Sequence, residues 1–269
     1  MTWTPSHREA ALAHVQKVGQ WIQEERLEFD ARQVESKSLN SLVSYVDRQA
    51  EEDLVSGFQS ILPGSGVIGE EGDYPWVDQG YNWVIDPLDG TTNFIHNLPP
   101  YAVSVALMDS EGLLWAAVFE LGQNMLFWAE REQGAWLNGH RLQISDGPEI
   151  HQGLVATGFP YHDFEAMEAY LQVLRACFQG SRGVRRFGSA ATDLAWVAQG
   201  RFAAFFEHGL APWDVAAGVL LVREAGGRVS DFSGQAQTDF ELIHARQIVA
   251  GNPHAQSTLV SWTQRHFSS

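Results

Sequence analysis

One stretch of the chain constrains its fold more than any other. An apolar run, Trp83-Val84-Ile85, leads into Asp86-Pro87-Leu88-Asp89-Gly90-Thr91-Thr92-Asn93-Phe94, which places two carboxylates three residues apart beside a glycine turn. Pro87 stiffens the bend because its ring fixes φ and it lacks a backbone donor, while Gly90 permits a close approach of backbone to ligand. The pattern predicts a buried strand that ends in a turn carrying both carboxylates.

The residue types in this turn favour a divalent metal and a phosphate. Asp86, the carbonyl of Leu88 and Asp89 can converge on one or two hard cations, because magnesium accepts carboxylate and carbonyl oxygens. Without a cation the two aspartates would repel each other. Thr91, Thr92 and Asn93 can cap a short helix whose free amides would face a phosphate.

The turn has three other possible interpretations. An Asp-Gly turn that caps a helix without any chemistry stays open, although the second carboxylate argues against it. A helix-loop-helix calcium site needs oxygen ligands at loop positions three and five, where this chain has Leu88 and Gly90. A phosphatase with an aspartyl nucleophile would need a carboxylate at the position of Pro87, so no covalent aspartyl intermediate can form there.

Two more acidic segments are candidates for the same site. Glu70 follows the apolar run Gly66-Val67-Ile68 and is expected at the end of a strand, where a surface turn is the plain alternative. Asp214 lies in the first turn of an apolar helical segment, where an acid ordinarily interacts with the helix dipole. Because Trp213 and Val215 flank it, the Asp214 carboxylate needs a cationic partner to offset its desolvation.

A further junction is a candidate ligand-binding segment. Arg185-Arg186-Phe187 leads into Gly188-Ser189-Ala190, a strand-to-helix junction in which Ser189 is a plausible cap and the small residues leave room for a ligand. Glu207, after two phenylalanines, can accept hydrogen bonds from the hydroxyls of a polyol, or else lies at an exposed strand end. His96 and His208 are interpreted as structural.

Composition limits the classes of function. The 17 basic and 33 acidic side chains give a formal net charge of −16, which opposes sequence-independent binding to nucleic acid or to an anionic membrane. An anionic phosphate substrate would then need bound metal. Cys177 is the only cysteine, which excludes an internal disulfide, and it is expected to be a buried helical thiol. No secretory signal, transmembrane stretch or lipidation signal is visible, so the cytoplasm is expected.

Hydrophobic periodicity indicates two halves. Apolar residues recur at helical spacing over 6–28 and 42–59, ahead of any strand, and strands at 83–86, 101–108, 113–119 and 125–129 suggest an antiparallel meander. After residue 146 the pattern alternates. Strands are expected near 153–157, 183–187, 202–206 and 247–250, and helices near 163–178, 189–198, 213–225 and 253–264. We therefore expect an N-terminal α+β half with the metal-binding loop (1–146) and a C-terminal α/β half with the substrate-recognition segments (147–269).

The three acidic segments, in this order and at these separations, resemble the inositol monophosphatase family of magnesium-dependent, lithium-sensitive phosphatases. The resemblance runs from about Lys37 to Gly251. It implies a layered α-β-α-β-α sandwich of mixed α+β and α/β character, with the active site between the halves, and it implies a homodimer.

The resemblance also assigns roles to residues. It implies that Glu70, Asp86, the Leu88 carbonyl and Asp89 bind metal, that Asp214 completes a second metal site, and that Glu70, Thr91 and Asp89 are catalytic, with Glu70 and Thr91 holding the attacking water. It implies that Gly90 and Thr91 offer amides to the phosphate, and that Gly188, Ser189, Ala190, Glu207 and Asp214 contact the substrate. Two Mg²⁺ sites are expected. One stretch departs from the family pattern, since Ser41 stands where an aspartate near Lys37 would support a third metal.

The resulting hypothesis is hydrolysis of a phosphate monoester by direct attack of metal-activated water, without a phosphoenzyme. The expected substrate is inositol 1-phosphate or a related cyclitol or sugar phosphate, because Thr92 stands where nucleotide phosphatases of the superfamily tend to have lysine. Histidinol phosphate, fructose 1,6-bisphosphate and adenosine 3',5'-bisphosphate are the alternative substrates. A non-catalytic regulatory binding protein is the alternative from a different class.

Overall fold

The computed structural model describes residues 2–29, 35–38, 41–159, 164–235 and 237–267, and of 35–38 and 41–43 it describes the backbone alone. The first half of the chain forms helices α1 (Pro5–Glu28), α2 (Tyr45–Ile61) and α3 (Thr91–Ile95). Its strands are β1 (Glu35–Ser38), β2 (Ser41–Val43), β3 (Gly66–Gly69), β4 (Asn82–Asp89), β5 (Ala102–Asp109), β6 (Gly112–Glu120), β7 (Met125–Glu130), β8 (Gly134–Leu137) and β9 (His140–Arg141).

The second half of the chain alternates helices and strands. Its helices are the 3₁₀ turn η2 (Ile150–Gln152), α4 (Met167–Gly180), α5 (Ala190–Ala198), α6 (Pro212–Glu224), α7 (Asp239–His244) and α8 (Pro253–Phe267). Its strands are β10 (Val155–Thr157), β11 (Val184–Arg185), β12 (Ala204–His208), β13 (Arg228–Ser230) and β14 (Gln247–Gly251). No helix in these described ranges has both the length and the apolar character that crossing a membrane requires.

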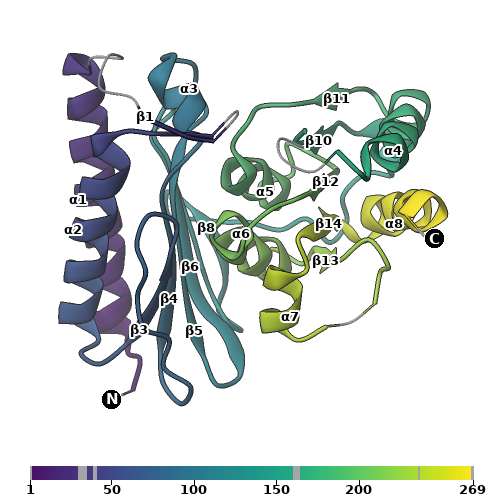
Figure 1. Cartoon of the computed structure of the whole chain (residues 1–269). Helices are drawn as coiled ribbons and strands as arrows, with labels where there is room; N and C mark the ends of the chain where they lie inside the picture. The colour runs from purple at the N-terminus through teal and green to yellow at the C-terminus, as the bar shows by residue number, and fades with distance from the viewer. Residues whose placement is uncertain (1, 30–34, 39–40, 160–163, 236, 268–269) are drawn as a thin grey trace.

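Five layers stack in the order helices, sheet, helices, sheet, helices. Helices α1 and α2 cover one face of a seven-stranded sheet, α5 and α6 lie between this sheet and a five-stranded one, and α4 and α8 cover the far side (Figure 1). The sheet orders are β3-β4-β5-β6-β7-β8-β9 and β11-β10-β12-β14-β13. The predicted α-β-α-β-α sandwich of mixed α+β and α/β character is confirmed.

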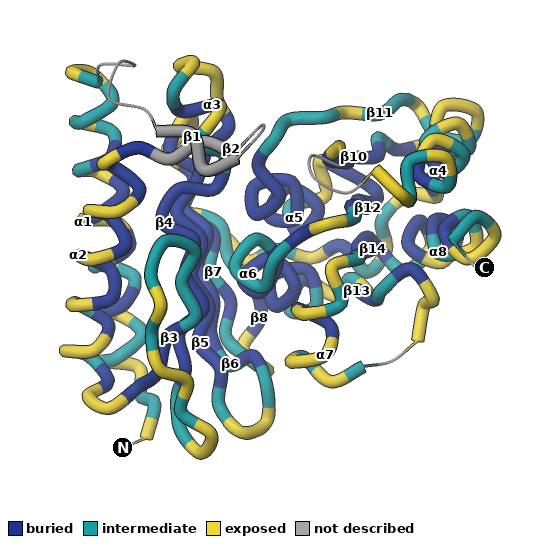
Figure 2. The backbone as a smooth tube through the Cα atoms, viewed as in Figure 1, coloured by how far each residue is buried: buried dark blue, intermediate teal, exposed yellow. Residues whose placement is uncertain are grey.

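Alternation along the strands explains the layering. In β4, Trp83 and Ile85 pack against α1 and α2, whereas Val84 between them faces α5 and α6. In β12, Phe205 faces the central helices and Phe206 the outer ones. Strands buried on both faces are expected to be continuously apolar, as these are. The middle strands of the first sheet and the central helix α5 are buried almost throughout (Figure 2).

The core does not stop at the predicted boundary. One cluster of buried side chains runs from Val84 and Phe127 of the first sheet, through Leu194 of α5, to Phe205 of the second sheet. The division into residues 1–146 and 147–269 therefore stays a prediction about organisation, although the seven-stranded sheet ends at Arg141 and the five-stranded sheet begins at Val155.

Several element predictions need correction. The helix expected to start at residue 42 begins at Tyr45, because Ser44 is its N-cap and pairs with Asp47 in a capping box. Residues 41–43 instead form β2, which pairs with β1, so two strands do precede α2. The short helix after the glycine turn is capped by Gly90 in a left-handed conformation (φ 92°), without a side-chain cap from Thr91.

Candidate active site

Three aspartates from two distant elements meet at one point. Asp86 and Asp89 lie on β4 and Asp214 lies in the first turn of α6, and each contributes a carboxylate oxygen to a group whose atoms are within 4.8 Å of one another. The sequence placed these residues in one site, and the structure brings them together. Oxygen donors in this arrangement can hold a hard divalent cation.

A β-bulge explains how Asp86 and Asp89 reach the same side of the sheet. Residues three apart on a regular strand point to opposite faces. In β4 the pairing with β5 shifts register between Asp86, opposite Ser104, and Asp89, opposite Ala102. Pro87 has no N–H to give to a ladder, and the N–H of Leu88 donates to Asp86 Oδ1 at 2.9 Å. The strand thus continues through both aspartates, where the sequence had suggested that it ended at residue 86.

Asp89 ties the first sheet to the central helices. Its Oδ2 accepts hydrogen bonds from Ser189 Oγ at 2.6 Å and from the N–H of Ala191 at 2.7 Å, at the start of α5. Ser189 is the N-cap of α5, as the sequence predicted. Burial raises the pKa of Asp89 to about 6, although these hydrogen bonds act in the opposite direction. The Asp89 carboxylate is therefore held in place by hydrogen bonds that do not neutralise its negative charge.

The neighbouring carboxyls are short of positive charge as well. Burial, followed by the charges of Glu70, Asp89 and Asp214, raises the pKa of Asp86 well above its usual range. Burial and then the Asp89 charge do the same to the pKa of Asp214, which also accepts a hydrogen bond from the N–H of Ala211 at 2.7 Å. Glu70 follows β3 and lies close enough to act on both aspartates, though it is outside the tight three-residue group. A bound divalent cation would offset this like-charge repulsion.

Thr91 connects this group to Asp47, which closes the stretch compared with the family's third-metal pattern but was not among the predicted site residues. The Thr91 hydroxyl lies 2.8 Å from Asp47 Oδ1 and 3.1 Å from the Leu88 carbonyl oxygen, so its single proton serves one of these acceptors at a time. Asp47 itself is buried, which raises its pKa, and the Ser44 backbone and hydroxyl hold its other oxygen. Asp47 could have been noticed as an acid in the first turn of a helix, but that position ordinarily indicates capping.

Gly90 and the segment from Gly188 to Ala190 lie against each other. A Cβ on Gly90 would come within 3.2 Å of the carbonyl oxygens of Gly188 and Pro100, and φ at Gly90 is 92°. The Asn93 side chain donates to the carbonyls of Pro100 and Phe187, both at 2.7 Å. Glycine is required at this point, and the predicted phosphate and alcohol segments are adjacent, as their assigned roles demand.

The alcohol side of the site contains two buried acids and an arginine. Glu207 lies at the end of β12, directly over Gly158, where any Cβ would overlap its carboxylate. Burial, then the charges of Asp193, Asp214 and Asp89, raises the pKa of Glu207 well above its usual range, and Arg186 opposes the shift. This electrostatic proximity places Glu207 beside the aspartate group, where the sequence expected a substrate contact.

Asp193 was missed by the sequence interpretation. It lies on α5, is 1% exposed, and its Oδ1 has no hydrogen-bond partner among the described residues. Burial and then the Asp89 charge raise the pKa of Asp193 well above its usual range, with Arg186 acting against them. The available signal was a charged residue in a helix whose other residues are all apolar, small or threonine, which is unusual for a buried helix.

Other residues lie apart from this group or outside the described part. The His208 ring packs against Phe232 and Phe267, in keeping with a structural role, whereas His96 is exposed and its role stays a prediction. The side chains of Lys37 and Ser41 lie outside the described residues, so the expectation about a third metal stays a prediction. Cys177 is fully buried, as predicted, and burial raises the pKa of its thiol to about 12.

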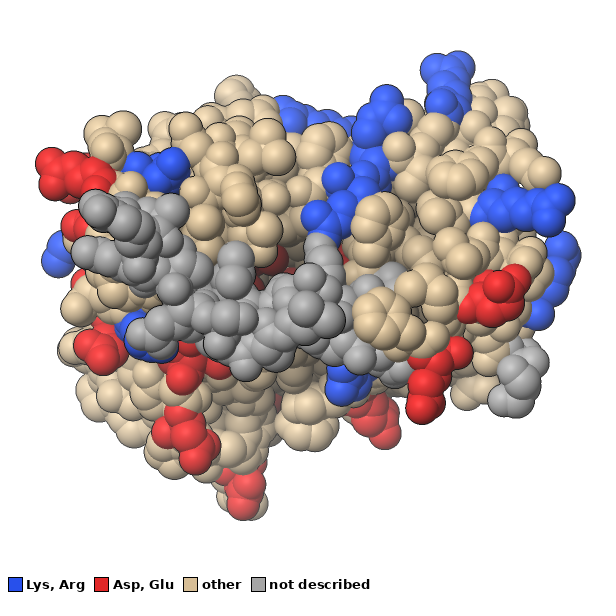
Figure 3. Space-filling model, turned by 45° about the horizontal axis from the view of Figure 1, so that its top comes forward, with Lys and Arg blue, Asp and Glu red and all other residues tan. Residues whose placement is uncertain are grey.

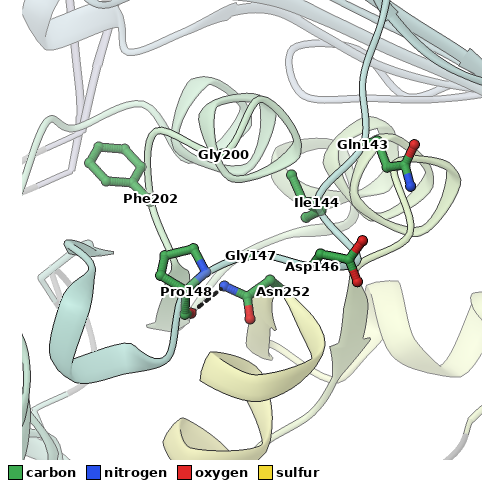
Figure 4. A pocket seen from close by; sticks show the side chains of 8 residues that line it. All are labelled: Gln143, Ile144, Asp146, Gly147, Pro148, Gly200, Phe202 and Asn252. Carbon is green, nitrogen blue, oxygen red and sulfur yellow. Dashed lines mark hydrogen bonds between the residues drawn. The ribbon is translucent and has the colours of Figure 1, made fainter.

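A pocket elsewhere in the fold contains none of these residues. It has a volume of about 500 Å³ and lies where the chain crosses between the two sheets (Figure 4). Asn252 donates to the carbonyl of Pro148 across this pocket at 2.9 Å and caps α8 through its other side-chain atom. The polar side chain of Asn252 therefore stabilises the local fold.

The fold and the aspartate group together define the class of protein. The model of the inositol monophosphatase family matches residues 5–267, and the chain belongs to this family. Two curated relatives are the Nus factor SuhB of Pseudomonas aeruginosa, 40% identical over 261 residues (95% of each chain), and that of Escherichia coli K12, 42% identical over 252 residues (93% of each chain).

Solved structures give the same result. The chain is similar to the extragenic suppressor protein suhB from Bartonella henselae, with a TM-score of 0.88 and 34% identity over 96% of this chain and 98% of the other. It is also similar to an IMPase from Thermotoga maritima, with a TM-score of 0.87 and 28% identity over 98% of each chain. The family resemblance that the sequence suggested is confirmed.

Proposed function

We propose that this chain is a Mg²⁺-dependent phosphatase that hydrolyses a phosphate monoester of a polyol, with inositol 1-phosphate or a related cyclitol or sugar phosphate as substrate. The observation that carries the proposal is the convergence of the buried Asp86 and Asp89 with the partly buried Asp214, close to the charge of Glu70. Burying uncompensated carboxylates costs stability, so their grouping favours a function that requires a cation.

The proposed roles follow from where the side chains lie. Two Mg²⁺ ions, when bound, would supply the positive charge that favours ionisation of a water and stabilises the leaving oxygen. Asp86, Asp89, Asp214, Glu70 and the Leu88 carbonyl would hold them. Thr91 and Glu70 would orient the attacking water, with Asp47 fixing the Thr91 hydroxyl at 2.8 Å. Proline at position 87 stands where a phosphatase with an aspartyl nucleophile has its nucleophilic carboxylate, so attack by water would be direct.

The phosphate and the alcohol would occupy adjacent parts of the site, because Gly90 lies against Gly188. The backbone amides of Gly90 and Thr91 would donate to phosphate oxygens as charge develops on them. Gly188, Ser189 and Ala190 would line the alcohol side, where Glu207, with Asp214 nearby, accepts hydrogen bonds from substrate hydroxyls. Glycine at 158 and at 188 leaves space for the Glu207 and Arg186 side chains, which a Cβ would displace.

Release of inorganic phosphate from inositol 1-phosphate tests the proposal. We expect release with Mg²⁺, none with chelator, and suppression by added lithium. Asp214→Asn should lose most of kcat, whereas Asp146→Asn, an exposed aspartate remote from the site, should not. If inositol 1-phosphate is not cleaved, turnover of histidinol phosphate, fructose 1,6-bisphosphate and adenosine 3',5'-bisphosphate decides among the alternatives. Failure on all four would contradict a phosphatase function.

A partner-binding role is the second candidate, favoured by the name Nus factor that the curated relatives carry. The absence of nucleic acid as a partner, argued from net charge, stays a prediction. On the face shown in Figure 3, Lys and Arg side chains gather toward the upper right and Asp and Glu lie mostly toward the left and lower edges, so local charge differs from the total. Complementation of a deletion strain by an inactive Asp214→Asn protein would support the partner role.

The proposed assembly is a homodimer. Light scattering after size-exclusion chromatography measures it directly, and a mass near the 29.9 kDa of one chain would contradict it.

A further inference from the structure

A second pocket lies between the segment after β3 and helix α7. Its volume of about 400 Å³ is within the range of small-molecule sites. Four aromatic side chains and two polar ones dominate its lining, and the rest is glycine and aliphatic surface from β3 and the following turn. These six residues, called the aromatic pocket below, are Asp73, Tyr74, Trp76, Trp213, Phe240 and His244.

Two rings of the aromatic pocket are open to solvent. Trp76 is 39% exposed and Phe240 is 49% exposed, and they meet edge to face with ring centroids 5.7 Å apart. The His244 ring also contacts that of Phe240, with ring centroids 4.2 Å apart and a tilt of 32° between the rings. Large exposed aromatic side chains that are grouped around a hollow favour ligand binding, because an apolar body that covers them removes their surface from water.

The charges of the residues that line the aromatic pocket indicate the sign of the charge on its ligand. Asp73 is the one carboxylate among the lining residues, and none of them is Lys or Arg. The faces of Trp, Tyr and Phe rings attract cations, and they do so most strongly where water is excluded. The net charge of −16 adds to this preference at longer range. An anion would meet both Asp73 and the negative ring faces.

The walls of the aromatic pocket are fixed before any ligand arrives. Glu51 of α2 accepts a hydrogen bond at 3.0 Å from the N–H of Glu71, so the segment that carries Tyr74 is pinned to that helix. The Tyr74 ring also covers Gly72. Trp213 is held by its place in the first turn of α6. A preformed pocket costs a ligand little ordering energy.

We propose that the aromatic pocket binds a small organic cation with an apolar body, of the alkylammonium class. The rings of Trp76, Phe240 and Trp213 cover the apolar body and the cationic head, and Asp73 supplies the countercharge. The site is separate from the aspartate group, but Gly69 and Trp213 in its wall directly precede Glu70 and Asp214. Binding does not depend on the proposed phosphatase activity.

Isothermal titration of the full chain with benzyltrimethylammonium tests the proposal. We expect saturable binding that weakens about fivefold or more in Trp76→Ala and in Phe240→Ala. Phe178→Ala is the matched control, because Phe178 is another exposed helical phenylalanine, 62% exposed, and lies outside the pocket. Unchanged affinity in both pocket variants, or no saturable binding by the wild type, would overturn the proposal.

A pair of isosteric ligands separates charge from hydrophobicity. Choline and 3,3-dimethylbutan-1-ol have the same shape, and choline alone is charged. We expect choline to bind at least about threefold more tightly. Equal affinity would overturn the assignment to a cation and leave an unselective apolar pocket. Asp73→Asn keeps every ring in place and should remove part of the preference for choline, so the test holds even if a ring variant does not fold.

Discussion

Replacing Asp89 by asparagine should make the metal-free protein more stable while abolishing activity. The asparagine oxygen can take the place of Oδ2, which accepts from Ser189 Oγ at 2.6 Å and from the N–H of Ala191 at 2.7 Å, so the contact with α5 is kept. The charge is lost. Burial is the largest cause that raises the Asp89 pKa from 3.8 to about 6.

The size of the effect follows from that shift. A rise of about two pH units corresponds to about 3 kcal/mol that ionised Asp89 takes from the free energy of unfolding. Because the pKa of the Asp89 carboxyl is raised in the folded state, its ionisation lowers the free energy of unfolding. This cost is absent below pH 4, grows as pH rises, and is complete above pH 6. Because the asparagine amide must also be desolvated, we expect a net gain of about 2 kcal/mol at pH 7.5. For a chain of this length that is about 3 to 4 °C in Tm.

Thermal and urea unfolding in chelator, at pH 4.5 and 7.5, measures the effect. Asp89→Asn should exceed the wild type at pH 7.5 and approach it at pH 4.5, whereas Asp146→Asn should match the wild type at both. Saturating Mg²⁺ should reverse the order, since a ligand at a hundred times its Kd stabilises the wild type by about 2.7 kcal/mol. A metal-free Asp89→Asn that is less stable than the wild type at pH 7.5 would refute the reasoning.

Three smaller experiments test the surroundings of the site. Ser189→Ala removes the 2.6 Å hydrogen bond to Asp89 and the cap of α5, and should lower the free energy of unfolding by about 1 to 2 kcal/mol in urea titrations; an unchanged midpoint would contradict the capping role. Gly90→Ala places a Cβ at φ 92° and within 3.2 Å of the Gly188 carbonyl oxygen, so we expect a loss of about 1 to 3 kcal/mol, and a variant as stable as wild type would show that this contact yields. Cys177 has a pKa raised by burial to about 12, so a thiolate-specific disulfide reagent should label it only after unfolding; rapid labelling of the native protein would disprove its burial.

The sequence predicted the parts of the fold and site that depend on local chemistry. The apolar run before Asp86 and the glycine at position 90 are sufficient to indicate a buried strand and a turn, and Ser189 is a recognisable cap. The order of the layers was predicted from the family resemblance alone, because hydrophobic periodicity does not indicate how helices and sheets stack. The metal-binding and catalytic roles of the assigned residues stay predictions, although the structure places those residues side by side.

What the sequence did not predict depends on contacts between distant segments. The register shift in β4 is set by pairing with β5, and a linear pattern cannot show on which face Asp86 and Asp89 emerge. Asp193 resembles an ordinary acid in the first turn of a helix, and only packing shows that the whole helix is buried. The strands β1 and β2 were missed because the helical period of the following segment seemed to begin before its true cap at Ser44.

The acids of this site are destabilising where they are, and that supports a functional interpretation. These acids come from four elements, β4, α5, β12 and α6, and all have pKa values raised first by burial; they are Asp86, Asp89, Asp193, Glu207 and Asp214. A core built for stability alone would place apolar side chains at these positions. Hydrogen bonds at the starts of α5 and α6 hold Asp89 and Asp214 without neutralising them, and Arg186 only partly offsets the raised pKa values of Asp193 and Glu207. The group is therefore left short of positive charge, which a bound cation would supply. A divalent cation bound by Asp86, Asp89 and Asp214 would offset the repulsion among them and so stabilise the junction of the two sheets. The same bound cation would be available to bind substrate.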